Sequence, residues 1–321
     1  DSKVREESSS GGAFTGLYTD IIKNGGYVIG VKYDNKMNVV YDIATTLDEC
    51  KKFRGAKYVR ANNDEIYPKI KEKLETDKPV LVTGTPCFIA GLKAYLNRDY
   101  ANLITMDIIC HGTPSQKIFK KYINELEEQY NSKIKDFKFR DKSNGWQTAT
   151  VRIEFETGKV ISKLLKQNSY GSAFLKSLTY RPCCYNCEFV KDNTMGDLTV
   201  ADFWATRVKY QEMDDNKGIS MVIINNKKGE EVFNRIKNGY VCKEIPYEDA
   251  FLGNHTRPVD IKAERQIIFE EIQDNDVSKV LSKYVKKSKS KNVAEKKKIK
   301  SKIKKVIPRP LKRVVKKIIK K

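Results

Sequence analysis

The chain has 321 residues, which is enough for one large domain or two ordinary ones with a hydrophobic core of normal size. No apolar run approaches the ~20 residues that a membrane-spanning helix needs, and nothing resembles a signal peptide. The net charge is +21, but residues 279–321 hold 18 lysines and 2 arginines against one acid, so the basicity belongs to a tail and the rest is nearly neutral.

Short apolar runs alternate with helical patterns through the first 130 residues. Serines and glycines at 8–12 precede apolar positions at helical spacing, which end at Gly25 and Gly26. Strand, turn and helix repeated in this way predict an α/β body. The predicted helices are at about 13–24, 64–74, 86–96 and 115–130, and the predicted strands are at 27–33, 79–84 and 103–110.

The pattern changes between residues 133 and 165, where apolar and polar residues alternate as in an antiparallel hairpin or meander. Strands at 197–204 and 220–226 and a helix at 228–239 follow. We therefore expect an α/β fold, with a mixed sheet flanked by helices and an antiparallel β insertion at about 133–165. The expected organisation is one domain over residues 1–275 and a basic amphipathic helical tail over residues 276–321.

The tail has two apolar stripes at helical spacing, with lysines on the opposite side. Ile299, Ile303 and Val306 belong to the first stripe, and Leu311 and Val315 belong to the second. This pattern predicts a pair of interfacial helices on an anionic lipid surface, with the protein in the cytoplasm at the inner face of the membrane. The alternative is a disordered basic tail that binds RNA without sequence preference.

Seven cysteines is an odd number, and three of them fall within residues 183–187. Such a set does not fit a disulfide framework, so we expect reduced thiols in the cytosol, some of them bound to metal. Cys184 and Cys187 form a C-x-x-C pair, which suits zinc, an iron–sulfur cluster or a dithiol redox pair. Cys50 and Cys242 have no motif around them and are interpreted as structural.

Cys87 and Cys110 each follow a short apolar strand and precede a helix. In an α/β sheet such positions share the carboxyl edge, where sites assemble, so both thiols are expected to meet the C-x-x-C pair there. Four thiolates suit a cubane cluster as well as they suit zinc. The alternative for both residues is a small buried core side chain, the commonest role of an isolated cysteine.

Eight stretches occur in one order: SSSGGAFTGL, NGGYVIGVKY, RGAKYV, VTGTPCFIAGLKAYL, DIICHGTPS, FRDKSNGW, RPCCYNCEF and GDLTVADFW. In this order they resemble the coenzyme F420 hydrogenase/dehydrogenase beta-subunit family over residues 5–260. The resemblance implies an oxidoreductase that holds FAD beside one [4Fe-4S] cluster and passes electrons between the cluster and a hydride carrier or organic substrate. The implied carrier is F420, a nicotinamide nucleotide or reduced ferredoxin. The tail adds the hypothesis of a lipid-linked or polysaccharide substrate at a membrane surface.

The resemblance also implies a ligand set. The position of Cys183 is a serine in the family's usual R-P-S-C pattern, so Cys183 is the extra thiol.

Many relatives carry a ferredoxin-like segment ahead of the SSSGG motif, and because this chain begins at Asp1 we expect such a segment to be missing from it. The expected partner is an electron-donor protein such as ferredoxin, or a fused ferredoxin-like domain. The implied cluster ligands are Cys87, Cys110, Cys184 and Cys187.

A flavin of this kind needs a site for its diphosphate. Residues 8–12 offer glycines for close backbone approach and a helix N-terminus for an anion, although an ordinary N-cap with a tight turn has the same sequence. Lys57 is a candidate partner for a phosphate or an acidic substrate, and its alternative is an exposed lysine. The candidate cofactor-binding residues are Ser10, Gly11, Gly12, Lys57, Gly84 and Thr85.

His111 follows the implied ligand Cys110 and is the candidate catalytic residue, as a proton donor next to a flavin. The alternative role for His111 is an orienting hydrogen bond. Asp202 has two interpretations, helix capping and site chemistry. Four residues of FRDKSNGW either shape the substrate face or form a charged hairpin loop, and these are Arg140, Asp141, Lys142 and Trp146.

The sequence departs from the family at a motif that commonly reads GDFWG, because it has Ala201 and Ala205 at the two glycine positions. An added methyl group at each position would crowd a close backbone approach to cofactor or substrate. Two other classes of function therefore stay open. One is a zinc-binding module whose tail binds nucleic acid or a membrane, with nucleic acid the less favoured partner. The other is a catalytically inactive relative that keeps the fold as a scaffold.

Overall fold

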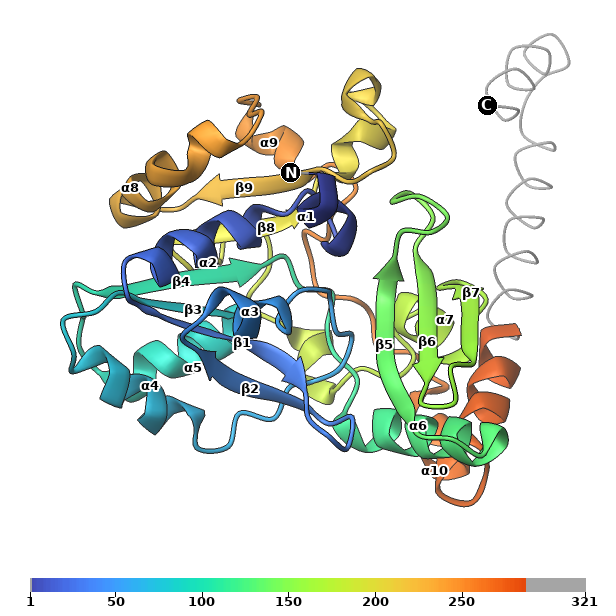
Figure 1. Cartoon of the computed structure of the whole chain (residues 1–321). Helices are drawn as coiled ribbons and strands as arrows, with labels where there is room; N and C mark the ends of the chain where they lie inside the picture. Colours follow the sequence, from blue (N-terminus) through green and yellow to red (C-terminus); the bar gives the residue numbers. More distant parts are fainter. Residues whose placement is uncertain (1, 287–321) are drawn as a thin grey trace, which may run out of the picture.

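The computed structural model describes residues 2–286, which fold around two β-sheets (Figure 1). In the larger sheet the four central strands run parallel, while each edge strand is antiparallel to its neighbour. The central strands are almost continuously apolar, as expected for strands covered on both faces. In spatial order the strands are β2 (Val39–Ala44), β1 (Tyr27–Tyr33), β3 (Val80–Gly84), β4 (Leu103–Ile108), β8 (Leu198–Asp202) and β9 (Ser220–Ile224).

Helices cover both faces of this sheet and make two separate hydrophobic clusters with it. Helices α2 (Ala13–Lys23), α3 (Leu47–Lys51) and α8 (Lys227–Ile236) pack on one face, where Leu17 and Ile21 meet buried strand residues. Helices α4 (Ile66–Leu74) and α5 (Pro86–Leu96) pack on the other face. The result is a three-layer α/β/α arrangement, in which the carboxyl ends of the parallel strands lie at one edge.

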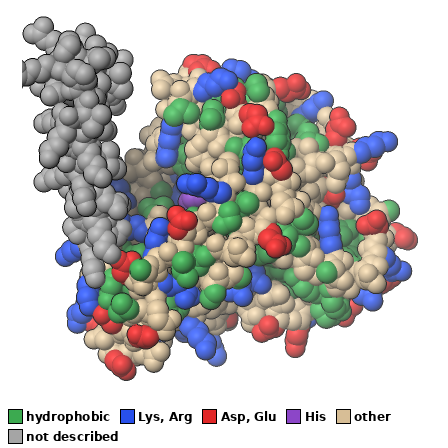
Figure 2. Space-filling view, turned by 180° about the vertical axis from the view of Figure 1, so that it is seen from behind, with side chains coloured by type: hydrophobic (Ala, Val, Ile, Leu, Met, Phe, Trp, Pro, Cys, Tyr) green, Lys and Arg blue, Asp and Glu red, His purple; other side chains and the backbone are tan. Residues whose placement is uncertain are grey.

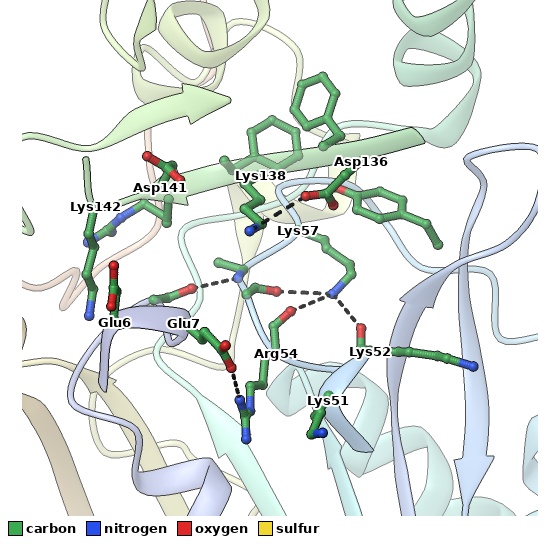
Figure 3. Close-up of a pocket in the computed structure, with 17 residues that line it drawn as sticks. Glu6, Glu7, Lys51, Lys52, Arg54, Lys57, Asp136, Lys138, Asp141 and Lys142 are labelled. Atoms are coloured by element: carbon green, nitrogen blue, oxygen red, sulfur yellow. Dashed lines mark hydrogen bonds and ion pairs between the residues drawn. The ribbon is translucent and has the colours of Figure 1, made fainter. Parts of the chain in front are cut away.

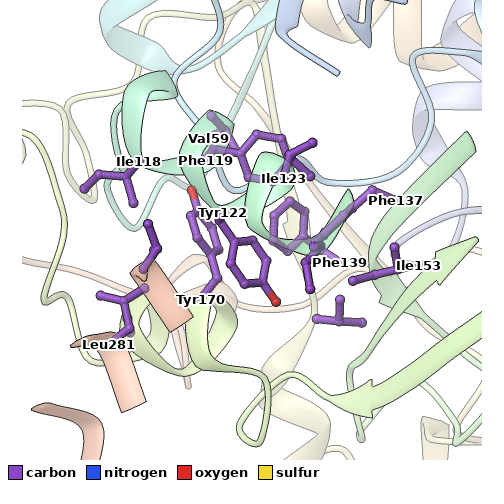
Figure 4. Close-up of a cluster of buried hydrophobic side chains, with 14 of the residues drawn as sticks. Val59, Ile118, Phe119, Tyr122, Ile123, Phe137, Phe139, Ile153, Tyr170 and Leu281 are labelled. Carbon is purple, nitrogen blue, oxygen red and sulfur yellow. The ribbon is translucent and has the colours of Figure 1, made fainter. Parts of the chain in front are cut away.

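The smaller sheet is antiparallel, with strands β5 (Ile134–Asp141), β6 (Thr150–Phe155) and β7 (Val160–Leu164) in sequence order. It packs against α6 (Gln116–Tyr130), α7 (Ser169–Leu175), α10 (Arg265–Asp274) and a helix at 277–286. Aromatic side chains fill the space between these elements (Figure 4). This cluster stands beside the larger sheet, as Figure 1 shows.

Short elements complete the described chain. Helix α1 (Ser2–Glu7) precedes α2, and α9 (Tyr247–Ala250) precedes α10. Four 3-10 helices connect the later elements, namely η1 (Pro182–Asn186), η2 (Trp204–Arg207), η3 (Gln211–Met213) and η4 (Lys237–Gly239).

The predicted fold class is confirmed: a mixed sheet flanked by helices, with an antiparallel sheet inserted at residues 134–164. Strand β2 and helices α3, α7 and α10 were not predicted from the sequence. Strand β2 pairs with β1 in a hairpin whose turn is closed by Asp34, because its carboxylate accepts hydrogen bonds from the N–H groups of Lys36 and Asn38 at 2.8 Å each.

The packed body continues past the boundary expected at residue 275. Residues 277–286 are helical, and Val277, Leu281 and Tyr284 are buried in the core of the smaller sheet. Their spacing of three and four residues puts them on one face of the helix. The two apolar stripes of the tail, at 299–319, lie outside the described residues.

Charged side chains of both signs are interspersed over the face shown in Figure 2, as expected for a nearly neutral body. Within residues 2–286 no helix has the length and apolar character needed to cross a membrane.

Replacing Leu281 with alanine should lower the free energy of unfolding by about 2–5 kcal/mol, because the Leu281 side chain is fully buried and its removal leaves a cavity. Chemical denaturation measures this value. Lys279→Ala on the exposed side of the same helix is the control and should leave the unfolding free energy unchanged. Equal effects of the two substitutions would show that residues 277–286 do not belong to the folded core.

Candidate functional site

A large cavity opens at the carboxyl edge of the parallel strands, between the two sheets. Its volume is about 780 Å³. The larger sheet contributes Gly84 from β3 and Ile108 from β4, and the smaller sheet contributes Arg140 from β5 and Leu164 from β7. Ligands of open α/β sheets bind at this edge, so the position of the cavity follows from the fold.

The cavity is strongly positive. Among the described residues that line it, Asp202 is the one carboxylate, and two histidines, His111 and His255, are also present. Such a lining favours a molecule that carries several negative charges. Six basic side chains line it: Arg54, Lys57, Arg60, Arg140, Lys166 and Arg207.

The serine-glycine turn at 8–12 lies at the wall of this cavity, before the N-terminus of α2. Ser10 and Gly12 line the cavity, and Gly12 has a positive φ of 93° that favours glycine. Gly11 instead packs against β9: its N–H donates to Ser220 Oγ at 2.9 Å, and a β-carbon there would lie 2.6 Å from the Ser220 nitrogen. The Ser10 hydroxyl donates to the Ile219 carbonyl at 2.6 Å, so protein groups already fix this turn.

Lys142 holds the same turn from the smaller sheet. Its ammonium donates to the carbonyl oxygens of Arg5, Ser10 and Lys217 at 2.6–2.7 Å. Burial lowers the pKa of Lys142 to about 8. All three ammonium protons are used, so this lysine is a structural anchor for the turn.

Lys57 lines both the large cavity and a second cavity of about 300 Å³. Figure 3 shows it among the residues of the second cavity. Its ammonium donates to the carbonyl oxygens of Arg54 and Gly55 at 3.2 Å each and of Lys52 at 3.5 Å, and burial lowers the pKa of Lys57 to about 8. Two other bases of the small cavity are close to carboxylates, since Arg54 pairs with Glu7 at 2.5 Å and Lys138 lies 3.7 Å from Asp136. The Lys57 ammonium is bonded to the backbone of residues 52–55.

Gly84 and Thr85 end β3 at the cavity wall. A β-carbon at Gly84 would lie 2.5 Å from the Phe88 ring, so glycine is needed where the strand turns into α5. Thr85 is the N-cap residue of α5, and its hydroxyl lies 3.2 Å from the Cys87 sulfur. This contact places a candidate cofactor residue directly against a candidate metal ligand.

The structure brings the four candidate cysteine ligands to one region. Cys87 is in the first turn of α5 and Cys110 follows β4, both at the carboxyl edge. Cys184 and Cys187 belong to the η1 segment, which is tied to the chain after Cys110 by the Arg181 N–H donating to the Thr113 carbonyl at 3.0 Å. A bridge between Pro114 and Tyr180 reinforces this connection.

The surroundings of Cys110 disfavour its thiolate form. Burial raises the pKa of Cys110 to about 12, and negative charge on Cys87, Cys184 or Cys187 raises it further. Burial also raises the pKa of Cys184 and of Cys187. These thiols are therefore neutral when no metal is bound, and a metal is needed to hold them as thiolates.

Within residues 2–286 no three histidine, cysteine or acidic side chains are gathered closely enough to share a single metal ion. A cubane cluster needs a wider arrangement, because each thiolate bonds to a different iron atom. Cys183 and Cys242 are exposed, whereas Cys50 is buried in the core, and its pKa is raised to about 12 by burial.

His111 and His255, the two histidines of the chain, meet at the wall of the large cavity with their rings in edge contact. Burial, together with His255, lowers the pKa of His111 to about 3. The Nδ1 atom of His111 is buried and has no hydrogen-bond partner among the described residues. Figure 2 shows a histidine beside basic side chains in a hollow of the surface.

A buried charge network joins the two sheets at the cavity. Arg140 on β5 pairs with Asp202 at the end of β8 at 2.9 Å, and their side chains are only 8% and 17% exposed. The Trp146 indole N–H donates to the same carboxylate at 2.8 Å, and Trp146 stacks on Trp204 with ring centroids 4.7 Å apart. Asp202 thus accepts hydrogen bonds from two residues of the inserted segment. The FRDKSNGW segment contributes Arg140 to the cavity wall.

Ala201 and Ala205, which stand at the glycine positions of the family's GDFWG motif, lie in different surroundings. Ala201 lines the large cavity, so its methyl group takes up space there. Ala205 is fully buried in a small cluster with Phe203 and Tyr210, away from the cavity lining.

The family model for the C terminus of the coenzyme F420 hydrogenase/dehydrogenase beta subunit matches residues 77–250, a segment that contains all four candidate ligands. The chain belongs to this family. It is therefore an oxidoreductase of the hydrogenase/dehydrogenase type, as the order of its motifs predicted. The turn at 8–12 and His255 lie outside the matched segment, yet they line the same cavity.

A solved chain of the F420-reducing [NiFe] hydrogenase complex from Methanosarcina barkeri, determined in a study of xenon derivatization, has a similar fold. The TM-score is 0.52 at 19% sequence identity, and the similarity covers 93% of this chain and 90% of that chain. No curated protein matches the chain.

The Asp202→Asn substitution should lower the free energy of unfolding by about 3–5 kcal/mol, because it leaves the buried Arg140 guanidinium without its counter-charge. Asparagine keeps an oxygen for the Trp146 indole, so the effect isolates the charge pair. Urea denaturation measures it. Asp215→Asn is the control: the Arg5–Asp215 pair is exposed and its loss should change stability little. A small effect at both positions would contradict a buried cross-sheet pair.

Proposed function

We propose that this chain is a flavin- and iron–sulfur-dependent oxidoreductase, in which Cys87, Cys110, Cys184 and Cys187 hold one [4Fe-4S] cluster and the large cavity holds FAD with its electron partner. When bound, a flavin exchanges two electrons as hydride and a cubane cluster carries one at a time, so together they connect hydride and single-electron chemistry. The electron partner is a hydride carrier such as F420 or a nicotinamide nucleotide, or an organic substrate.

The observation that carries this proposal is the position of Cys110. Cys110 lines the large cavity, Cys87 contacts the cavity residue Thr85, and the segment with Cys184 and Cys187 is bonded to the chain at Thr113. A cluster held by these thiols would therefore share a wall with the molecule in the cavity. Electron transfer between two redox groups needs this proximity, whereas a zinc-binding scaffold does not.

The residues of the cavity fit a dinucleotide. Basic side chains supply counter-charges for a diphosphate, and apolar residues such as Val31, Phe53 and Met106 supply a wall for a flat ring system. His111 lines the cavity, where its candidate roles are a proton donor and an orienting hydrogen bond.

Anaerobic incubation with iron and sulfide should load about four iron and four sulfide per chain, with the broad visible absorption of a cluster. Cys110→Ser and Cys184→Ser should each abolish this loading, because each removes a thiolate ligand. Metal analysis and absorption spectra measure the result.

Cys183→Ser and Cys242→Ser are the matched controls and should load normally. Loss of the cluster in Cys183→Ser would show that the ligand set is wrong. One zinc ion per chain and a colourless protein would instead support the scaffold function.

FAD should bind to the large cavity, and Lys166→Glu should weaken binding on the order of tenfold, because the reversal places negative charge at the mouth of a cavity that must accept a diphosphate. Quenching of flavin fluorescence measures the dissociation constant, and added salt should weaken binding in the same direction.

Lys163→Glu carries the same change of charge on the same sheet, but Lys163 is exposed and outside the cavity lining. It should bind FAD nearly as tightly as the unchanged protein. If both variants weaken FAD binding equally, then either FAD binds at another site or its affinity depends only on the net charge of the protein.

A further inference from the structure

The C-x-x-C segment is fastened at its far end by a buried carboxylate, that of Asp107 in β4. The Asp107 side chain is 0% exposed. Its Oδ2 atom accepts hydrogen bonds from the N–H groups of Met195 at 2.7 Å and Gly196 at 2.9 Å. Met195 follows Cys187 by eight residues, and Asp107 precedes Cys110 by three. One carboxylate therefore joins the C-x-x-C segment to the strand that leads to Cys110.

Met195 also contacts the helix that carries Cys87. The Lys93 ammonium donates to the Met195 carbonyl oxygen at 2.7 Å. Lys93 belongs to α5 and follows Cys87 by six residues. Met195 is thus held through its N–H by the strand before Cys110 and through its carbonyl by the Cys87 helix. The three chain segments that supply the candidate ligands meet at this one residue.

The contact at Asp107 has little freedom. The other carboxylate oxygen accepts a hydrogen bond from the Thr199 hydroxyl at 2.5 Å. A β-carbon at Gly196 would lie 2.7 Å from the Asp107 nitrogen, so glycine is needed for the two chains to approach this closely. A buried carboxylate that accepts three hydrogen bonds keeps its place, because moving it would leave buried donors unpaired.

The short stretch between Cys187 and Met195 is folded on itself. The Val190 N–H donates to the Glu188 carbonyl, and the Asn193 N–H donates to the Val190 carbonyl, at 3.1 Å each. The Asn193 side-chain amide also donates to the Glu188 carbonyl, at 2.6 Å. A compact turn transmits the position of its anchor better than a flexible chain, because fewer conformations are open to it. Fixing Met195 therefore limits where Cys187 can lie.

We propose that Asp107 and Lys93 are positioning residues for the metal centre, which hold the C-x-x-C pair against Cys87 and Cys110 and so slow the loss of the cluster. This inference rests on the proposed function. The physical reason is that a thiolate which leaves an iron atom rebinds quickly only if its chain segment stays in place. Groups that orient metal ligands from outside typically change metal affinity by about 10- to 100-fold.

The first test is the rate at which a chelator removes iron from the reconstituted protein under anaerobic conditions, followed by the loss of visible absorption. Asp107→Ala should release iron about tenfold faster than the unchanged chain. Asp197→Ala is the matched control and should release iron at the normal rate. Asp197 is also a buried carboxylate, but it accepts hydrogen bonds from Thr105 and from the start of α8 instead of the C-x-x-C segment.

Lys93→Met tests the second contact with little effect on folding, because Lys93 is exposed. It should release iron about fivefold faster, as expected for the loss of one hydrogen bond. Lys71→Met, which removes an exposed lysine from the neighbouring helix α4, controls for the change of net charge and should release iron at the normal rate. If Asp107→Ala does not fold, this comparison decides alone.

A second readout uses the metal-free protein. Amide hydrogen exchange at Met195 and Gly196 should be faster in Asp107→Ala than in Asp197→Ala, because only the first substitution removes the acceptor of these two N–H groups. Equal exchange at these amides in the two variants would contradict the anchoring of the segment by Asp107.

The outcomes separate the two proposals. Normal iron release in Asp107→Ala and Lys93→Met, both fully loaded, overturns the positioning role and leaves the proposed function standing. Faster release in only one of these variants overturns the role of the other residue. Equal acceleration in Asp107→Ala and Asp197→Ala overturns the role of Asp107, because the effect then follows from lost stability. Failure of the unchanged chain to load any cluster overturns both proposals.

Discussion

The ion pair between Arg140 and Asp202 fixes the relation of the two sheets, and the site depends on that relation. Arg140 belongs to the inserted sheet and Asp202 ends a strand of the parallel sheet, so a single buried contact closes the space between them. The Trp146 indole donates to the same carboxylate, so two side chains of the inserted segment are tied to one residue of the parallel sheet. Opposite charges buried in this way hold one geometry, because neither partner can be exchanged without leaving the other unpaired.

The parts of the site that came from the larger sheet were predictable from sequence. Cys87 and Cys110 follow apolar strands, and parallel strands necessarily end at a common edge, so their convergence needs no knowledge of side-chain packing. The same argument explains why Gly84, Thr85 and His111 line one cavity. The same argument led us to expect the C-x-x-C pair beside them, and the family resemblance named Cys87, Cys110, Cys184 and Cys187 as one ligand set.

Other features have no local signature. The Arg140–Asp202 pair joins residues 62 positions apart. The sequence around each residue is equally compatible with an exposed charge on the surface. The turn at 8–12 has the composition of a phosphate site, but its Ser10 hydroxyl and Gly11 N–H bond to β9. The helix at 277–286 did carry a signal, because Val277, Leu281 and Tyr284 recur at helical spacing. Lysines lie between these positions, so in composition the helix resembles the basic tail that follows it.

The cavity has walls from two hydrophobic clusters of different origin. One wall rises from the parallel sheet, which also carries Cys87 and Cys110, and the other comes from the antiparallel insert through residues such as Ala149 and Leu165. Ala149 and Leu165 pack in a different cluster from the strands that precede Cys87 and Cys110, so the shape of this wall and the placement of those two cysteines depend on separate packing contacts. The width of the cavity can therefore change through substitutions in the insert while the parallel strands keep their own packing.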